Sequence, residues 1–298
     1  MFEVISMKKT VLEIKNLTKY YGKTLAVDDL SLSLTEGEIF GFIGPNGAGK
    51  STTIRSVMNL INKTKGEVLF LGETLDKNSI NLKKQIGYLP SDINLYDDMK
   101  VKNILDFHES FYKDIDTHSK RVNLVSKLEL DETKMIEDLS LGNRKKLGII
   151  LALMHSPKLV ILDEATSGLD PIMQRVFYDI LLEEKKNGTT IFYSTHILSE
   201  VSKICDRVGI IKEGKLVSIE SVKDLTKKSF LVVTIESKDI DSIIKTLKVK
   251  VDETKDNVAS FKYDGAPNLL IQKLSKFSID NILIEEASID DMFLHYYR

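Results

Sequence analysis

The sequence predicts an α/β protein with a largely parallel sheet, followed by a small α+β domain. Short apolar strands alternate with helices between residues 11 and about 219, which is typical of a parallel sheet. A glycine-rich loop joins one of those strands to a helix. After Phe230 glycine almost disappears, and the join at 221–228 is polar and charged. We therefore expect a first domain at 1–220, a linker at 221–228 and a second domain at 229–298.

Three apolar strands are expected in the first domain, at Glu38–Gly44, Lys158–Glu164 and Thr189–Thr195, with a hairpin turning at Glu213-Gly214. Between the first two strands, at about 91–156, the pattern becomes helical, which predicts an inserted helical subdomain. Ligands of such folds bind at the carboxyl ends of the parallel strands. Candidate site residues should therefore follow these strands.

The second domain is expected to have its own strands and helices in the order βαββαβ, which matches the ferredoxin-like motif. The expected elements are strand Phe230–Ile235, helix Asp239–Leu247, a hairpin whose second strand is Val258–Tyr263, helix Pro267–Lys276, strand Asn281–Glu285 and helix Ile289–Tyr297.

Composition restricts the class of protein. The net charge of −2 over 298 residues, with no basic stripe, argues against a nucleic-acid partner. The single cysteine excludes a disulfide within the chain, and its apolar neighbours predict that Cys205 is a buried packing residue. No apolar run approaches the roughly 20 residues of a membrane-spanning helix, and the first residues lack the apolar core of a signal peptide. Any work at a membrane is therefore expected from the cytosolic side, through a partner.

The glycine-rich loop GPNGAGKS fits the pattern GxxxxGK[ST] of a phosphate-binding loop. Glycines allow backbone N–H groups to surround phosphates, and the following helix adds its positive end. Lys50 is expected to reach the β and γ phosphates, and the Ser51 hydroxyl to bind Mg²⁺. The alternative is a plain glycine turn, but the strand before and the helix after the loop favour nucleotide binding. The predicted ATP contacts are Gly44, Pro45, Asn46, Gly47, Ala48, Gly49, Lys50, Ser51 and Thr52.

The strand LVILDE ends in two acidic residues, the pattern of a Walker B strand. Asp163 is expected to hold Mg²⁺, and Glu164 to polarise the attacking water as a catalytic base. Without the phosphate-binding loop, the better interpretation of the segment would be a buried strand that ends in a helix-capping acid. The phosphate-binding loop favours the functional interpretation.

Together, GPNGAGKST, ILDEATSGLDP and YSTHILSE resemble the nucleotide-binding domain of an ABC transporter, over about residues 11–219. The resemblance implies a P-loop NTPase fold of ABC type and an ATPase activity with ATP and Mg²⁺. It implies that Tyr21 stacks on adenine and that His196 is the catalytic switch that contacts the γ-phosphate. It also implies that Asp170, in a D-loop, lies at the interface with a second copy.

Two motifs depart from the family pattern. LSLGN at 139–143 stands where the family has LSGGQ, the signature that closes over the γ-phosphate bound by the other subunit. Ser140 and Gly142 are kept, so a hydroxyl and an unhindered N–H are still available. Ser91 stands where the Q-loop glutamine is usual; a serine also coordinates Mg²⁺ or a water, but its side chain is shorter.

The last 14 residues, EEASIDDMFLHYYR, resemble the end of ATPase subunits of the type-2 exporter branch, which export drugs, antibiotics or ions; the same residues also read as a helix with an apolar face. The resemblance implies a membrane-spanning permease subunit as partner, a homodimer or a heterodimer with a second ABC ATPase, and a place at the cytoplasmic face of the cell membrane. Two alternatives stay open. One is a non-transport ABC ATPase, such as a translation or DNA-repair factor, and the other is a regulatory module without turnover.

Overall fold

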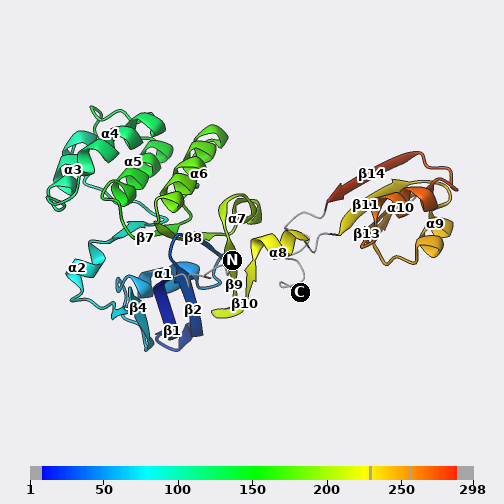
Figure 1. Cartoon of the computed structure of the whole chain (residues 1–298), viewed down its shortest axis with the longest axis horizontal. Helices are drawn as coiled ribbons and strands as arrows, with labels where there is room; N and C mark the ends of the chain where they lie inside the picture. Colours follow the sequence, from blue (N-terminus) through cyan, green and yellow to red (C-terminus); the bar gives the residue numbers. More distant parts are fainter. Residues whose placement is uncertain (1–8, 228–229, 256, 287–298) are drawn as a thin grey trace, which may run out of the picture. The chain divides into compact units, whose positions relative to one another are not determined.

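The computed structural model describes residues 9–227, 230–255 and 257–286. The chain divides into two compact units, residues 1–222 and 223–298, and each is described by itself (Figure 1). The helix expected at Ile289–Tyr297 lies outside the described residues. In the expected linker, the structure has a short helix, α8 (Val222–Lys227).

A six-stranded sheet forms the centre of the first unit, in the order β10-β9-β3-β8-β7-β6. All neighbouring strands are parallel except β10, which pairs antiparallel with β9. The three predicted apolar strands and the hairpin at Glu213-Gly214 are confirmed. The strands are β3 (Ile39–Ile43), β6 (Ile86–Leu89), β7 (Leu159–Asp163), β8 (Thr190–Thr195), β9 (Arg207–Lys212) and β10 (Lys215–Ser221).

Every residue of β3, β7 and β8 is buried, as expected for strands covered on both faces. Three helices complete this part of the chain: α1 (Lys50–Val57), α6 (Pro171–Lys186) and α7 (Leu198–Ile204). Because β3, β8 and β7 are parallel neighbours, the segments that follow them emerge at one edge of the sheet. The sheet thereby brings the predicted phosphate-binding loop, Glu164 and His196 together.

The first unit also contains a four-stranded antiparallel sheet that the sequence analysis did not predict. Its order is β2-β1-β4-β5, and its strands are β1 (Thr10–Tyr21), β2 (Thr24–Thr35), β4 (Lys65–Phe70) and β5 (Glu73–Thr74). One core cluster joins the two sheets, and it includes Leu12 and Phe70 of the antiparallel sheet, Ile54 of α1, and Phe42 and Phe192 of the central sheet. The short helix α2 (Ile80–Lys83) precedes β6.

The helical subdomain predicted at about 91–156 contains α3 (Val101–Glu109), α4 (Thr117–Leu128) and α5 (Leu141–Leu153). Helix α5 packs on β6 so closely that a Cβ atom at Gly87 would lie 1.9 Å from the carbonyl oxygen of Ala152. Any larger residue at Gly87 would push helix and strand apart. Among the described residues of the whole chain, no helix is long and apolar enough to cross a bilayer.

The second unit follows the predicted order of elements, and its antiparallel sheet has the strand order β12-β13-β11-β14. The elements are β11 (Leu231–Glu236), α9 (Ile240–Leu247), β12 (Val251–Lys255), β13 (Val258–Tyr263), α10 (Pro267–Leu274) and β14 (Asn281–Glu286). Its core is separate, because Val233 and Phe261 of the sheet pack with Ile243 of α9 and Leu270 of α10 in one cluster.

Candidate functional site

The glycine-rich loop connects β3 to α1, and two of its glycines leave no space for a side chain. A Cβ atom at Gly44 would lie 2.3 Å from the carbonyl oxygen of Ile211, and one at Gly49 would lie 2.6 Å from that of Ala26. Gly49 also has a φ of 107°, which favours glycine. The loop therefore owes its close packing against neighbouring strands to glycine, and helix α1 begins directly at Lys50.

The side chain of Lys50 is folded back over this loop. Its ammonium donates hydrogen bonds to the carbonyl oxygens of Gly44, at 2.7 Å, and Pro45, at 3.2 Å. Burial lowers the pKa of Lys50, while the nearby charges of Glu164 and Asp163 oppose that shift. The amine thus lies inside the loop, where the negative charge of a phosphate would favour its protonated form.

A cavity of about 200 Å³ lies over the loop and is lined by Ala26, Asn46, Gly47, Gly49, Lys50, Ser51, Thr52 and Glu164. A larger cavity, of about 670 Å³, lies between α4, α6 and the start of β7, and none of the predicted site residues lines it. Two of its lysines, Lys120 and Lys127, already form ion pairs with Glu184 and Glu183. The smaller cavity is the better nucleotide site because backbone N–H groups, a cation and a carboxylate converge there.

Asp163 ends β7 and is fully buried, yet among the residues that the structure describes neither of its carboxylate oxygens finds a hydrogen-bond partner. The hydroxyl of Ser194, its neighbour on β8, is also buried and has no hydrogen-bond partner within the described part of the chain. A buried carboxylate in this state is unfavourable unless a cation compensates it. Oxygen ligands of this kind suit Mg²⁺, which usually binds one or two carboxylates together with substrate phosphates. The chemistry of Asp163 therefore fits the predicted Mg²⁺ site, and Ser51 lines the cavity over the glycine-rich loop.

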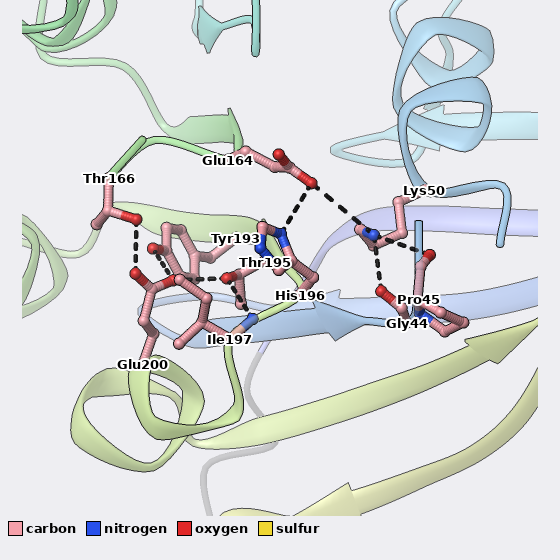
Figure 2. Close-up of polar contacts among 10 residues, drawn as sticks. All are labelled: Gly44, Pro45, Lys50, Glu164, Thr166, Tyr193, Thr195, His196, Ile197 and Glu200. Carbon is pink, nitrogen blue, oxygen red and sulfur yellow. Dashed lines mark hydrogen bonds and ion pairs between the residues drawn. The ribbon is translucent and has the colours of Figure 1, made fainter. Parts of the chain in front are cut away.

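Glu164 lies between Lys50 and His196 (Figure 2). One carboxylate oxygen of Glu164 lies 3.2 Å from His196 Nδ1 and 3.9 Å from Lys50 Nζ. The Glu164 backbone has a φ of 50°, unusual for a residue with a side chain, and its N–H donates to the carbonyl oxygen of Ser194. The structure thus brings the two predicted catalytic residues into direct contact beside the phosphate-binding lysine.

The predicted signature and D-loop also lie together. A Cβ atom at Gly142 would be 2.8 Å from the carbonyl oxygen of Gly168, and both segments line a cavity of about 360 Å³. Ser140 caps helix α5 by accepting a hydrogen bond from Asn143 N, and Asp170 caps α6 in the same way. The cavity lined by the signature and D-loop segments shares no lining residue with the cavity over the glycine-rich loop.

Tyr21 and Ser91 are among the predicted residues that do not line the cavity over the loop. Tyr21, at the end of β1, is half-exposed, and the ammonium of Lys19 lies 4.8 Å from the centre of its ring. Ser91, which follows β6, accepts a hydrogen bond through its backbone carbonyl oxygen from Lys145 Nζ, at 3.0 Å. The structure therefore does not place either side chain in the cavity over the phosphate-binding loop.

Sequence reasoning missed Lys145 and Glu200. Lys145 of α5 is buried; burial lowers its pKa, and the charges of Asp163, Asp92 and Glu164 oppose that shift. Glu200 is buried and bonded to a set of hydroxyl groups that includes those of Tyr193 and Thr195, on the strand before His196 (Figure 2). The isolated sequence carries no signal for either, because both residues lie among other charged or polar residues in helices.

Comparison with known proteins gives consistent matches. The profile of the ABC transporter family matches residues 27–167. The chain is 40% identical to the uncharacterised ABC transporter ATP-binding protein YhcH of Bacillus subtilis over 72% of each chain. It is 33% identical to the bacitracin transport ATP-binding protein BcrA of Bacillus licheniformis over 96% of each chain. A solved ATP-binding subunit of an ABC transporter superimposes with a TM-score of 0.69 at 27% identity, covering 73% of this chain and 92% of that one.

Proposed function

Because this chain belongs to the ABC transporter family, as an ATP-binding subunit with ATPase activity, we propose that it powers export through a separate membrane-spanning subunit. The cargo we propose is a drug, antibiotic, peptide, lipid or ion. The bacitracin transport protein supports this choice, since its similarity extends over 96% of both chains. The structural observation that carries the catalytic part of the proposal is the convergence of Lys50, Glu164 and His196.

In the proposed site, backbone N–H groups of the glycine-rich loop and the Lys50 ammonium bind the β and γ phosphates of ATP. Ser51 and Asp163 are the residues that would hold Mg²⁺, which supplies positive charge against the phosphate oxygens. Tyr21 and Ser91 are proposed to contact adenine and the Mg²⁺ shell once nucleotide is bound.

Glu164 is proposed to orient and deprotonate the attacking water. Glu164 lines the loop cavity, where a water in line with the γ-phosphate would be within reach of its carboxylate. His196 is proposed to contact the γ-phosphate while its Nδ1 atom keeps Glu164 in place. Phosphoryl transfer depends mainly on such positioning and on charge stabilisation.

The cavity formed by the signature and the D-loop is proposed to receive the nucleotide of a second subunit, which is either another copy or a homologous ATPase. Ser140, Gly142 and Asp170 line it, and Lys146 adds a positive charge. Its separation from the loop cavity of the same chain supports a role toward another subunit. We propose a peripheral location at the cytoplasmic face of the membrane, through the permease subunit, and no nucleic-acid partner.

Residues 1–220 are proposed to be the nucleotide-binding domain and residues 229–298 an accessory domain with a ferredoxin-like fold. The strand order β12-β13-β11-β14, together with the order of helices and strands along the chain, supports this description.

The substitution Glu164→Gln tests the catalytic proposal. We expect steady-state ATP hydrolysis to fall at least ~100-fold, because loss of a general base typically costs about 10²–10⁴ in rate. Affinity for a fluorescent ATP analogue should change less than about twofold, and light scattering should detect an ATP-bound dimer. The matched control is Glu183→Gln, an exposed glutamate of α6. A Glu164→Gln variant with near-wild-type turnover would remove Glu164 from the mechanism.

A further inference from the structure

Glu200 of α7 has a buried carboxylate that accepts hydrogen bonds from four hydroxyl groups. Its side chain is 2% exposed. Thr166 Oγ1 and Tyr178 OH lie 2.5 and 3.2 Å from Oε1. Tyr193 OH and Thr195 Oγ1 lie 2.7 and 2.5 Å from Oε2. Such a set of donors suits an ionised carboxylate, which can only accept hydrogen bonds.

The direction of these hydrogen bonds follows from their surroundings. The backbone N–H of Ile197 donates to Thr195 Oγ1 at 3.0 Å, so the Thr195 hydroxyl proton is left for Glu200. Burial raises the pKa of Tyr178 and of Tyr193, and the negative charge of Glu200 raises both further. Both phenols therefore keep their protons and act as donors.

Three of the four donors come from segments that carry the proposed catalytic residues, and the fourth, Tyr178, comes from α6. Thr166 lies two residues after Glu164, and Tyr193 and Thr195 belong to the strand that ends at His196. The Thr195 side chain also bonds the N–H of Ile197, so its hydroxyl links the residues on the two sides of His196. Figure 2 shows the carboxylate of Glu200 beside Thr166, Tyr193 and Thr195, to the left of the contact between His196 and Glu164.

We propose that Glu200 is a positioning residue for ATP hydrolysis, whose carboxylate holds the His196 segment against the Glu164 segment. The proposal rests on the function proposed above for Glu164 and His196. A buried carboxylate that only stabilised the fold would affect unfolding but would not act through His196. The two roles therefore predict different effects of a Glu200 substitution on kcat in a variant that already lacks the His196 side chain.

The primary test is Glu200→Gln in the full chain. The amide has nearly the same shape, but its NH₂ group cannot accept a hydrogen bond, so one pair of hydroxyls loses its acceptor. We expect kcat to fall about 10-fold or more, because a displacement of about 1 Å in a catalytic group can cost about 10²-fold. The dissociation constant for a fluorescent ATP analogue should change less than about twofold, since Glu200 does not line the loop cavity.

Two further variants separate positioning from folding. Thr195→Val keeps the shape of the side chain and removes the hydroxyl between Glu200 and Ile197, so it should reproduce the fall in kcat. Tyr178→Phe removes a donor to the same carboxylate from α6, away from both catalytic segments. It should lower the melting temperature while kcat stays within about twofold of wild type.

A double-mutant cycle gives the decisive measurement. If Glu200 acts through His196, the pair Glu200→Gln with His196→Ala should be no slower than His196→Ala alone. If the two substitutions together lowered kcat by the product of their separate effects, the proposal would be overturned. A wild-type kcat in Glu200→Gln would overturn it as well. If Glu200→Gln does not fold, Thr195→Val takes its place in the cycle, with the same two outcomes. A His196→Ala variant as fast as wild type would instead refute the proposed role of His196, and this inference with it.

Discussion

Lys145 Nζ donates a hydrogen bond of 3.0 Å to the carbonyl oxygen of Ser91. The bond joins helix α5, which Ser140 caps, to the segment that follows β6. It also fixes a buried ammonium near Asp163 and Glu164, whose charges oppose the lowering of its pKa by burial. One side chain thus links the proposed signature, the Q-loop position and the proposed catalytic carboxylates.

Replacing Lys145 by Met should lower the Mg²⁺ concentration that gives half-maximal ATP hydrolysis. A positive charge near Asp163 opposes the binding of a cation. At an effective dielectric constant of about 20, a unit charge within about 10 Å contributes at least ~1.4 kcal/mol, or roughly tenfold. Titration of Mg²⁺ at constant free ATP measures the shift. Lys145→Arg, which keeps the charge, is the control, and an unchanged Mg²⁺ requirement in Lys145→Met would contradict this reasoning.

Replacing Ser140 by Arg should abolish cooperative ATP turnover while nucleotide binding by the isolated subunit changes less than about twofold. Ser140 lines the cavity with Gly168 and Asp170, not the cavity over the glycine-rich loop. An arginine would fill that cavity and obstruct a second subunit. ATPase rate against protein concentration and fluorescence titration give the two readouts. An equal loss of ATP binding in the monomer would mean that Ser140 serves only to cap its own helix.

The first unit should lose stability in mild acid because of two histidines, the half-buried His108 and the buried His155. Burial lowers the pKa of His108, on α3, and of His155, after α5, to about 4 from the ordinary value of 6.5. Their rings lie 5.5 Å apart, and the charge of Lys120 lowers the pKa of His155 further. The unfolded chain therefore binds protons more readily, so stability is complete above about pH 6.5 and falls progressively toward pH 4.

At pH 5 each histidine should reduce the free energy of unfolding by about 1–2 kcal/mol relative to pH 7.5. Urea unfolding at several pH values measures the effect. A chain with His108→Leu and His155→Phe, in which Phe can still stack on Tyr112, should show a flatter pH dependence. The same slope in the double variant would assign the acid sensitivity to other groups.

Removing the second unit should leave ATP binding nearly unchanged. Every residue proposed to contact nucleotide lies in the unit that comprises residues 1–222. A chain that ends at Ser221, the last residue of β10, is expected to bind a fluorescent ATP analogue within about twofold of the full chain. A truncated chain that folds, as judged by circular dichroism, but no longer binds would show that the nucleotide site needs the second unit.

The central sheet and the glycine-rich loop were predictable because their signals are local. An apolar run of five to seven residues that ends in glycine or aspartate gives both the strand and the position of the site. The antiparallel sheet was missed in part because its β1 and β4 strands pair residues far apart in the sequence, such as Leu12 with Phe70. In β1 the register is also irregular, so the alternation of apolar residues is broken.

Lys145 and Glu200 could not be predicted because their burial depends on tertiary packing. Lys145 lies between Arg144 and Lys146, and the sequence alone makes the three equivalent. In the structure, Lys145 differs from its two neighbours because its side chain reaches the segment after β6. The partners of Glu200 lie up to 34 positions away along the chain, at Thr166. For Cys205 the prediction of a buried residue is confirmed, because its neighbours in sequence are also its neighbours in the core.

At Glu164 the left-handed backbone lowers the stability of the fold, while the carboxylate on that backbone is needed for the proposed ATP hydrolysis. A residue with a side chain in this conformation costs roughly 1 kcal/mol or more, a cost that glycine avoids. Glycine there would relax the backbone and at the same time delete the carboxylate. Heat or protease selection applied to a library of variants, without a requirement for ATP hydrolysis, should therefore enrich Glu164→Gly. This variant should be more stable than the wild type but no longer hydrolyse ATP.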